Sequence, residues 1–428
     1  MTKSIRLLTD GDADTAAVLR TQSDVEARIR AICFKTGPPS LIGAELEWTL
    51  HHTAAPSAPL SAEKLRQALG PHTPATLGPP APAHPLPAGG TITVEPGGQV
   101  EISSAPASSL TALHAAVSVD LAHLSSRLGS AGLTLGRHGV DAHREPRRLV
   151  HTPRYSAMEQ SFDARGPDGR VMMCSTAGLQ VCLDAGTGSE LATRWAAVSA
   201  LGPPLLAAFA NSRRRAGRDT GLASARMAAW WAMDPRLTHP VGTGDDPAGE
   251  WVRYALAAPL TCVRRDGGCW DAPPGVTLGD WVGGALPWAL TTDDVDYHLT
   301  TLFPPVRPHG YLEVRYLDAQ AGDDWFAPVA VLAALLADPA TTGQALDLAQ
   351  PVADRWVPAY ERGLDDPALR RAATAVLDLA ARRLSTAPTP ASAPHSASVA
   401  GGDRAQARLL EGGPALDRVL DSIERILR

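Results

Sequence analysis

Cysteine is scarce in this sequence, with five residues in 428. No two of them form a Cys-x-x-Cys pair, the usual half of a zinc site, and five thiols in so long a chain make no dense disulfide framework. We therefore expect reduced thiols. Cys262 and Cys269 lie close in sequence, and a metal or redox role for this pair is an alternative to plain core packing.

Long hydrophobic runs and a strong charge of one sign are also missing. The longest apolar run, residues 327–337, is about half of the roughly 20 residues that a bilayer-spanning helix needs, and a buried core helix explains it better. The formal net charge of −6 provides no basic field for nucleic acid. The first residues lack the apolar stretch of a secretory signal. These features predict a globular cytoplasmic protein with no membrane or nucleic-acid partner.

Several common nucleotide-binding and hydrolase motifs do not occur. There is no Gly-x-x-x-x-Gly-Lys-[Ser/Thr] loop, and no Gly-x-Gly-x-x-Gly opens a helix after a strand. His-Glu-x-x-His and Gly-x-Ser-x-Gly are absent as well, which argues against the zincin and α/β-hydrolase classes. If this protein binds ATP, metal ions and arginines must hold it.

The hydrophobic pattern predicts an α+β fold with a mainly antiparallel sheet, because helices and strands do not alternate regularly. Residues 12–34 predict an amphipathic helix with Asp12 or Asp14 as its cap. Residues 56–90 are crowded with Pro, Ala and Gly and predict a loop. Leucine and valine at helical spacing predict a helix on the sheet over 108–128. Further helices are predicted at 188–201, 221–233, 248–258, 325–337 and 366–384.

We predict one domain over residues 1–385, followed by a short tail. Residues 386–402 form a stretch rich in Pro, Ala and Ser that is typical of a linker. The final segment, 403–428, predicts a last helix from about residue 408, either packed back on the domain or free of it.

Three segments place carboxylates on one face of a predicted strand. In LIGAELEWTL, Glu45 and Glu47 alternate with apolar residues. In TITVEPGGQVEIS, two short strands flank a Pro-Gly-Gly turn, and Glu95 and Glu101 point away from their apolar neighbours. In YLEVRYLD, Glu313 shares its face with an arginine.

Such a face has two readings. Carboxylates two residues apart on a strand can reach adjacent hard cations, and magnesium prefers oxygen ligands and bridges them to phosphates. Repulsion within the group requires a metal ion or protons to neutralise it. The alternative is the solvated outer face of an antiparallel sheet, where alternating polar residues are ordinary. The pattern alone does not show that the three strands meet.

Six segments in order resemble the glutamate–cysteine ligase family of the plant and actinobacterial kind. The likeness covers about residues 40–320 and is closest to the actinobacterial enzymes that make γ-glutamylcysteine for ergothioneine synthesis. The matching segments are residues 43–47, 95–101, 170–181, 209–212 with 224–226, 298–307 and 311–315.

This resemblance implies a fold similar to the catalytic domain of glutamine synthetase, with a curved, mainly antiparallel sheet and helices packed outside it. It also implies catalytic roles for Arg315 and Glu45, with Arg315 facing the γ-phosphate of ATP. The implied Mg²⁺ ligands are Glu45, Glu47, Glu95, Glu101 and Glu313. The residues implied to lie near substrate or nucleotide are Arg226, Asn211, Gln180, Thr176, Arg154 and Tyr155.

The implied reaction joins the γ-carboxylate of glutamate to the amine of cysteine through an acyl phosphate that ATP supplies. One position departs from the plant pattern, because Cys182 stands where a polar Asn is expected. This leaves open a ligase with another amine acceptor, and a non-catalytic ATP-binding protein is a third hypothesis. His51 and His52 directly follow the first carboxylate strand, and we interpret them as loop residues because magnesium prefers oxygen ligands.

Overall fold

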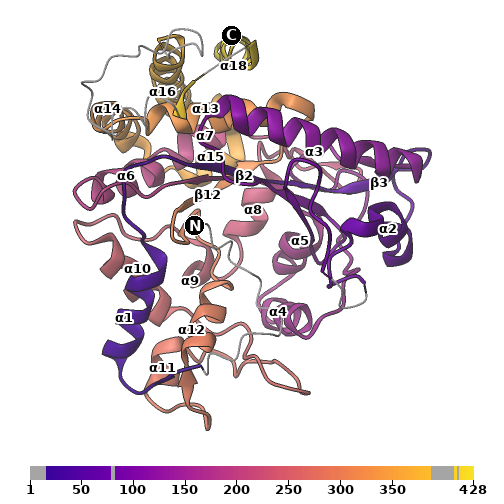
Figure 1. The fold of residues 1–428 in the computed structure, drawn as a ribbon, viewed down its shortest axis with the longest axis vertical. Coiled ribbons are helices and arrows are strands. Elements are labelled where there is room, and N and C mark those ends of the chain that lie inside the picture. The colour runs from indigo at the N-terminus through magenta and orange to yellow at the C-terminus, as the bar shows by residue number, and fades with distance from the viewer. Residues whose placement is uncertain (1–15, 79–81, 387–408, 412–413) are drawn as a thin grey trace.

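A six-stranded antiparallel sheet forms the centre of the computed structural model (Figure 1). The structure describes residues 16–78, 82–386, 409–411 and 414–428. The strand order is β11-β12-β7-β2-β5-β4. The strands span β2 (Ile42–Trp48), β4 (Thr91–Val94), β5 (Val100–Ser103), β7 (Gly178–Leu183), β11 (Val306–Pro308) and β12 (Leu312–Asp318).

The sheet has one apolar face and one polar face, as the alternation in β2 requires. Ile42, Ala44, Leu46 and Trp48 are buried, and the residues between them are half-buried. Every residue of β12 is buried, because elements cover this strand on both sides. Even its charged residues are thus removed from bulk water.

Helices cover the apolar face. In Figure 1, α3 (Leu110–Ser130) and α13 (Phe326–Leu335) lie above the sheet. The Ser109 hydroxyl caps α3, and a stripe from Leu110 to Leu128 is buried, which confirms the helix predicted there. The other helices of this layer are α6 (Leu191–Ala200), α7 (Gly202–Ala208), α14 (Pro339–Ala349), α15 (Trp356–Arg362) and α16 (Pro367–Ser385).

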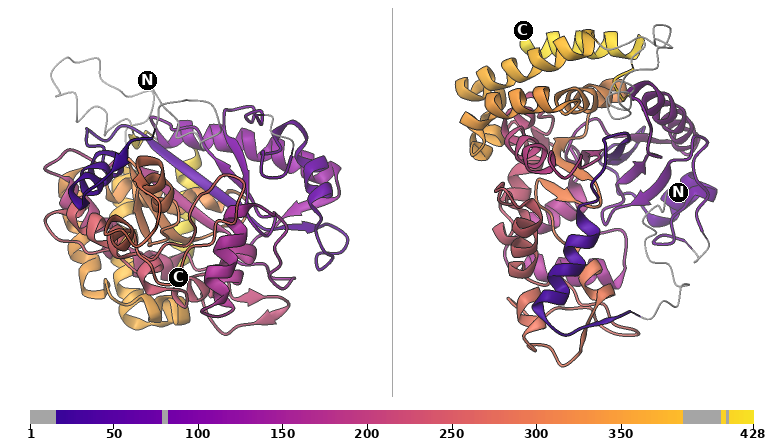
Figure 2. Two further views of the ribbon diagram at one scale, coloured as in Figure 1. Left: turned by 90° about the horizontal axis from the view of Figure 1, so that it is seen from below. Right: turned by 60° about the vertical axis from the view of Figure 1, so that its left-hand side comes forward.

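A second group of helices lies on the polar side of the sheet (Figures 1 and 2). It includes α4 (Pro153–Asp163), α5 (Asp168–Ser175) and α8 (Ala225–Trp231). Farther from the sheet lie α1 (Gln22–Cys33), α9 (Pro235–Thr238), α10 (Pro247–Ala257), α11 (Leu278–Val282) and α12 (Thr292–Leu299). Three small two-stranded sheets pair β1 (Val18–Leu19) with β10 (Leu290–Thr291), β3 (Leu50–His52) with β6 (Leu133–Leu135), and β8 (Arg214–Arg215) with β9 (Arg218–Asp219).

The structure corrects the start of the first helix. Helix α1 begins at Gln22, because the side chain of Thr21 accepts the Asp24 amide and the Asp24 carboxylate accepts the Thr21 amide. Val18, which lies inside the helix predicted over residues 12–34, belongs to β1. The caps proposed at Asp12 and Asp14 lie outside the described residues.

Two loop predictions are also wrong. The segment 56–90 contains α2 (Ala62–Leu69), which Ser61 caps, followed by a 3-10 turn over Gly70–His72. The eight residues after Ser61 contain no proline, and Leu65 and Leu69 give this helix a buried face, although the segment as a whole is rich in helix-breaking residues. His51 and His52 form β3 instead of a loop, because this strand pairs with β6.

The C-terminal helix packs back on the domain. Helix α18 (Pro414–Leu427) lies against α13 and α16, with Val419 and Ile423 buried. Arg418 pairs with Asp323 at 3.0 Å. The predicted linker, 386–402, lies almost entirely outside the described residues.

No single helix among the described residues is long and apolar enough to cross a membrane. In the part of the chain that the structure describes, one pair, Gly322–Leu335 and Pro339–Val352, is long and apolar enough when taken together, and its two segments are bent by 110° relative to each other.

Candidate active site

Strand register brings the predicted carboxylates onto one face of the sheet. Glu47 on β2 lies opposite Glu101 on β5. Glu45, two residues earlier on β2, shares this face. Glu313 on β12 lies opposite Cys182 on β7, the strand between β12 and β2. The carboxylate strands that lie far apart in sequence therefore do meet in space.

The pKa values of Glu45, Glu95 and Glu101 are raised above the ordinary range of a carboxyl group. Burial, followed by the charges of Glu101 and Glu313, raises the pKa of Glu45 well above its usual range. Burial, followed by Glu101 and Glu47, raises the pKa of Glu95 to about 8. Burial and then Glu47 raise the pKa of Glu101 to about 7, although the Thr93 and Ser103 hydroxyls donate to its carboxylate. These shifts are the expected response of neighbouring buried carboxyl groups.

Glu313 behaves in the opposite way because two arginines hold it. Burial opposes its ionisation, but Arg307 and Arg315 overcome this effect and lower the pKa of Glu313 to about 2. Arg307 on β11 donates to the two carboxylate oxygens at 2.7 and 3.1 Å. Arg315 Nη1 donates to Glu313 Oε2 at 2.8 Å. Glu313 thus holds two guanidinium groups on the same face as the other carboxylates.

Gln180 joins the arginine and carboxylate parts of this face. Its Nε2 donates to Glu47 Oε1 at 2.9 Å, and its Oε1 accepts from Arg315 Nη1. Glu47 Oε2 accepts the Gly178 amide at 2.6 Å. Gln180 therefore fixes the spacing between β2 and the arginine of β12.

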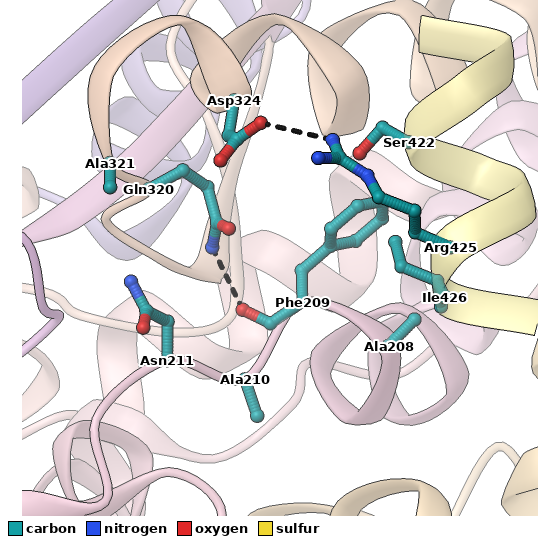
Figure 3. A pocket seen from close by; sticks show the side chains of 10 residues that line it. All are labelled: Ala208, Phe209, Ala210, Asn211, Gln320, Ala321, Asp324, Ser422, Arg425 and Ile426. Carbon is teal, nitrogen blue, oxygen red and sulfur yellow. Dashed lines mark hydrogen bonds and ion pairs between the residues drawn. The ribbon is translucent and has the colours of Figure 1, made fainter. Parts of the chain in front are cut away.

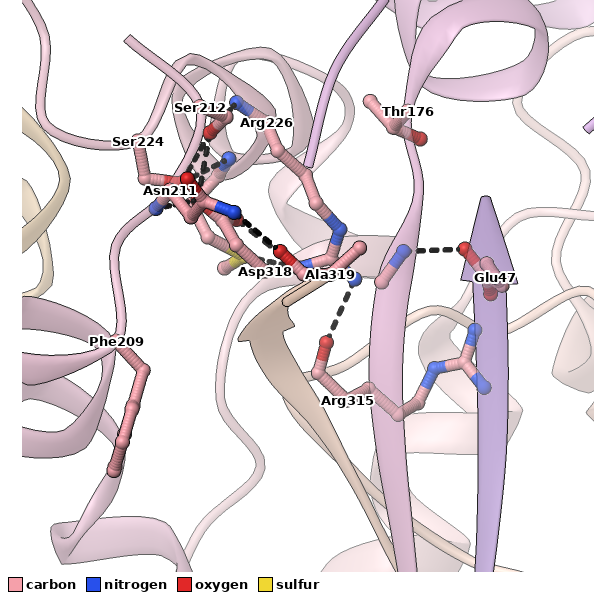
Figure 4. A network of polar contacts seen from close by, with 12 residues as sticks. Glu47, Thr176, Phe209, Asn211, Ser212, Ser224, Arg226, Arg315, Asp318 and Ala319 are labelled. Carbon is pink, nitrogen blue, oxygen red and sulfur yellow. Dashed lines mark hydrogen bonds and ion pairs between the residues drawn. The ribbon is translucent and has the colours of Figure 1, made fainter. Parts of the chain in front are cut away.

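Arg226 on α8 packs against the polar side of the sheet, at 1% exposure. Its Nη2 donates to the carbonyl oxygen of Arg315 at 2.9 Å (Figure 4). Its Nη1 is 3.8 Å from Asp318 Oδ1, and its guanidinium lies 5.0 Å from the Trp230 ring. The Arg226 side chain thus links α8 to the end of β12.

Helix α4 carries Arg154 and Tyr155 to the Glu95 end of the face. Arg154 is close enough for its charge to favour ionisation of Glu95, and Glu95 in turn helps burial to raise the pKa of Tyr155. Arg154 donates to Thr300 through both terminal nitrogens, at 2.9 and 3.0 Å, and lies 5.1 Å from the Tyr297 ring. Both residues are therefore near the carboxylates, as their predicted role requires.

The side chains of Thr176 and Asn211 donate to backbone carbonyls and not to the carboxylate face. The Thr176 hydroxyl donates to the Met172 carbonyl, so it is engaged within the α5 turn. Asn211 donates to the carbonyls of Arg137 and Ala319 and lines a cavity of about 290 Å³ beside α18 (Figure 3). In that cavity Arg425 of α18 is 3.4 Å from Asp324. The cavity lies at the end of β12 and is not lined by the predicted carboxylates.

Sequence reasoning missed three side chains of this face. Arg307 lies in a segment that carries the family likeness, but no role was predicted for it. Its register opposite Glu313 is visible only once β11 and β12 are paired. The hydroxyls of Thr93 and Ser103, which hold Glu101, have no sequence signal beyond strand alternation.

The donor set fits magnesium in its chemistry. The polar face holds five carboxyl groups, and burial together with mutual repulsion raises the pKa values of Glu45, Glu95 and Glu101, so a cation bound there would favour their ionised forms. All of these donors are oxygens, which magnesium prefers. Within the described ranges, however, no three Asp, Glu, His or Cys side chains converge closely enough to hold a metal ion.

The family model described as glutamate–cysteine ligase family 2 matches residues 41–420. The chain belongs to this family. Curated members include EgtA, a glutamate–cysteine ligase of Mycobacterium tuberculosis, which is 40% identical over 363 residues and matches 83% of this chain and 82% of its own. The chloroplastic glutamate–cysteine ligase of Arabidopsis thaliana is 32% identical over 63% of this chain and 52% of its own length.

The fold of this family member also has a relative among solved structures. A glutamate–cysteine ligase from Francisella tularensis, in complex with AMP, covers 92% of this chain and 82% of its own, with a TM-score of 0.50 and 12% identity. This likeness concerns the fold alone. The predicted family and the predicted α+β fold of this ligase class, with its mainly antiparallel sheet, are confirmed.

Proposed function

We propose that this protein is a cytoplasmic ligase that uses Mg-ATP to join the γ-carboxylate of L-glutamate to the amine of L-cysteine. The single observation that carries the proposal is the polar sheet face, where Glu45, Glu47 and Glu101 lie beside an arginine pair bound to Glu313. Family membership and the 40% identity to the mycobacterial glutamate–cysteine ligase support this choice. They also support a product that feeds ergothioneine synthesis.

The chemistry requires an activated carboxylate, because an ionised carboxyl group does not react with an amine in water. The γ-carboxylate of glutamate attacks the γ-phosphorus of ATP, which releases ADP and forms γ-glutamyl phosphate. The cysteine amine then attacks the acyl carbon, and phosphate leaves. Each step moves negative charge on phosphate oxygens, so positioned cations are the main catalytic requirement.

Arg315 is the side chain that we assign to the transferring phosphate. Glu313 and Gln180 hold its guanidinium in place before substrate arrives, so little reorganisation is needed. Arg307 adds a second positive charge on the same face. Arg154 and Tyr155 on α4 lie near Glu95, where they bind substrate groups.

The candidate Mg²⁺ ligands are Glu45, Glu47, Glu95, Glu101 and Glu313, of which Glu313 is already engaged by two arginines. Bound magnesium would screen the repulsion between the carboxylate and the phosphates. Arg226 and Asn211 act indirectly in this proposal, since Arg226 donates to the Arg315 carbonyl and Asn211 donates to backbone carbonyls.

The test measures ADP release with Mg-ATP and glutamate, with and without cysteine, and identifies the product by mass. γ-Glutamylcysteine formed only with all three substrates is the expected result. ADP release that is indifferent to glutamate would exclude a glutamate ligase. No ADP with any amine would favour a non-catalytic ATP-binding protein.

A ligase with another amine acceptor is the second candidate, because Cys182 occupies the middle of the polar face. Its thiol lies opposite Gly43 and Glu313, and burial followed by Glu45 and Glu313 raises its pKa well above the usual range. A neutral thiol offers weaker hydrogen bonds to a substrate than the amide expected there. Mass analysis of products from a panel of amines separates the two ligases.

A further inference from the structure

Strand β12 has an irregularity at Arg315. Val314 pairs with Val181 on β7, but the next pair joins Leu317 to Leu179, so two residues of β12 lie opposite Gln180 alone. Such a bulge interrupts the ladder of backbone hydrogen bonds and turns the bulged side chains in a new direction. Here it turns Arg315 towards Gln180, to which Arg315 donates.

The Arg226 side chain satisfies the backbone at this bulge. The carbonyl of Arg315 accepts from Arg226 Nη2 at 2.9 Å, while the amide of Arg315 donates to Pro305. Gly178 on β7 makes room for this guanidinium, because a Cβ at that position would lie 3.0 Å from Arg226 Cζ and closer still to Nη2. The Arg226 side chain, which comes from α8, thus replaces a backbone hydrogen bond between the two strands.

Asp318 is the carboxylate that lies beside the Arg226 guanidinium. It is fully buried, and Oδ2 accepts the Asn211 amide at 2.8 Å and the Ser212 hydroxyl at 2.7 Å (Figure 4). Oδ1 accepts the Ser224 hydroxyl at 2.9 Å and lies 3.8 Å from Arg226 Nη1. A buried arginine without a counter-charge is costly, so this carboxylate keeps Arg226 in place.

We infer that Asp318 and Gly178 are positioning residues for catalysis, which set the direction of the Arg315 guanidinium through Arg226 and the bulge. Neither is among the residues proposed to bind magnesium, ATP or the amino acids. This inference rests on the proposed function, in which Arg315 stabilises charge on the transferring phosphate. A small displacement of such a group affects the transition state more than the binding of ATP.

The experiment uses the full chain and two variants that disturb Arg226 in different ways. Asp318→Asn removes the charge and one acceptor, and Gly178→Ala fills the space beside the guanidinium. Both are expected to lower kcat for γ-glutamylcysteine formation at least about tenfold and to leave KM for ATP within about threefold. Urea unfolding of each variant separates this effect from loss of the fold.

Matched controls make the same substitutions elsewhere. Asp323→Asn changes an exposed carboxylate that pairs with Arg418, and Gly129→Ala adds a methyl group with no atom within 4 Å. Both should keep the parent kcat. A folded Asp318→Asn or Gly178→Ala variant with unchanged kcat would overturn the inference. So would failure of both variants to fold, which would assign the cluster to stability. An unaltered chain that makes no dipeptide would instead defeat the proposed function.

Discussion

Replacing Arg315 by alanine tests the centre of the proposed site. The guanidinium donates to Glu313 and to Gln180. After Arg315→Ala, Arg307 still holds Glu313 through bonds of 2.7 and 3.1 Å, so its carboxylate keeps a partner. The amide oxygen of Gln180 loses its partner, and one buried polar group left unpaired costs about 1–3 kcal/mol of folding free energy.

The catalytic loss should be larger than this structural loss. Removing one group that stabilises transition-state charge costs about 10²–10³ in kcat. We therefore expect kcat for ADP release to fall at least about a hundredfold in Arg315→Ala while the chain stays folded. Circular dichroism and urea unfolding report the fold, and coupled detection of ADP reports the rate.

Arg194 provides the matched control for this variant. It is also a buried arginine, and it donates to the carbonyls of Leu336 and Asp184 at 2.7 and 2.9 Å, away from the carboxylate face. Arg194→Ala should lose stability and keep kcat. If Arg315→Ala is folded and retains kcat within about threefold, Arg315 does not stabilise the transferring phosphate.

Three further predictions concern the turn between β4 and β5, the buried His298 side chain and the proposed Mg²⁺. Gly97→Ala should destabilise the chain in urea, because the new Cβ would lie 2.6 Å from the Cys174 carbonyl carbon and closer to its oxygen; wild-type stability would contradict this contact. Burial lowers the pKa of His298 to about 4. The unfolded chain binds this proton near pH 6.5, so stability should be full above that pH and fall towards pH 4, by up to about 3 kcal/mol. In His298→Gln, the free energy of unfolding measured in urea should depend less on pH between about 4 and 6.5. An unchanged pH dependence would refute this role of His298. Chelation of divalent ions should abolish ADP release and Mg²⁺ should restore it, whereas full activity in chelator would exclude the proposed metal.

The polar face itself was predictable from sequence, because strict alternation fixes which residues of one strand share a side. Glu45 and Glu47 follow from β2 alone. The partners of each strand were not predictable, since register depends on packing across the whole sheet. For this reason the pairing of Glu47 with Glu101, and the role of Arg307 beside Glu313, required the structure.

The predicted start of the first helix was wrong because a local capping box competed with a longer apolar pattern. The apolar pattern ran back to residue 12, but the reciprocal bonds of Thr21 and Asp24 start α1 later. Helix α5 gave no amphipathic signal, because six of its eight residues, including Val171, are buried. The role of Asp318 could not be predicted from the sequence, since its hydrogen-bond partners come from segments about a hundred residues away.

The order of strands in the sheet has a consequence during synthesis. Strands β2, β4, β5 and β7 are complete once residue 183 has been made, but β12, which covers the free edge of β7, ends at Asp318. Until then the nascent chain carries an open strand edge, which can pair with other chains. Slow translation between residues 183 and 318 should therefore favour aggregation, and Arg315, the arginine that we propose for catalysis, is made together with the strand that covers this edge.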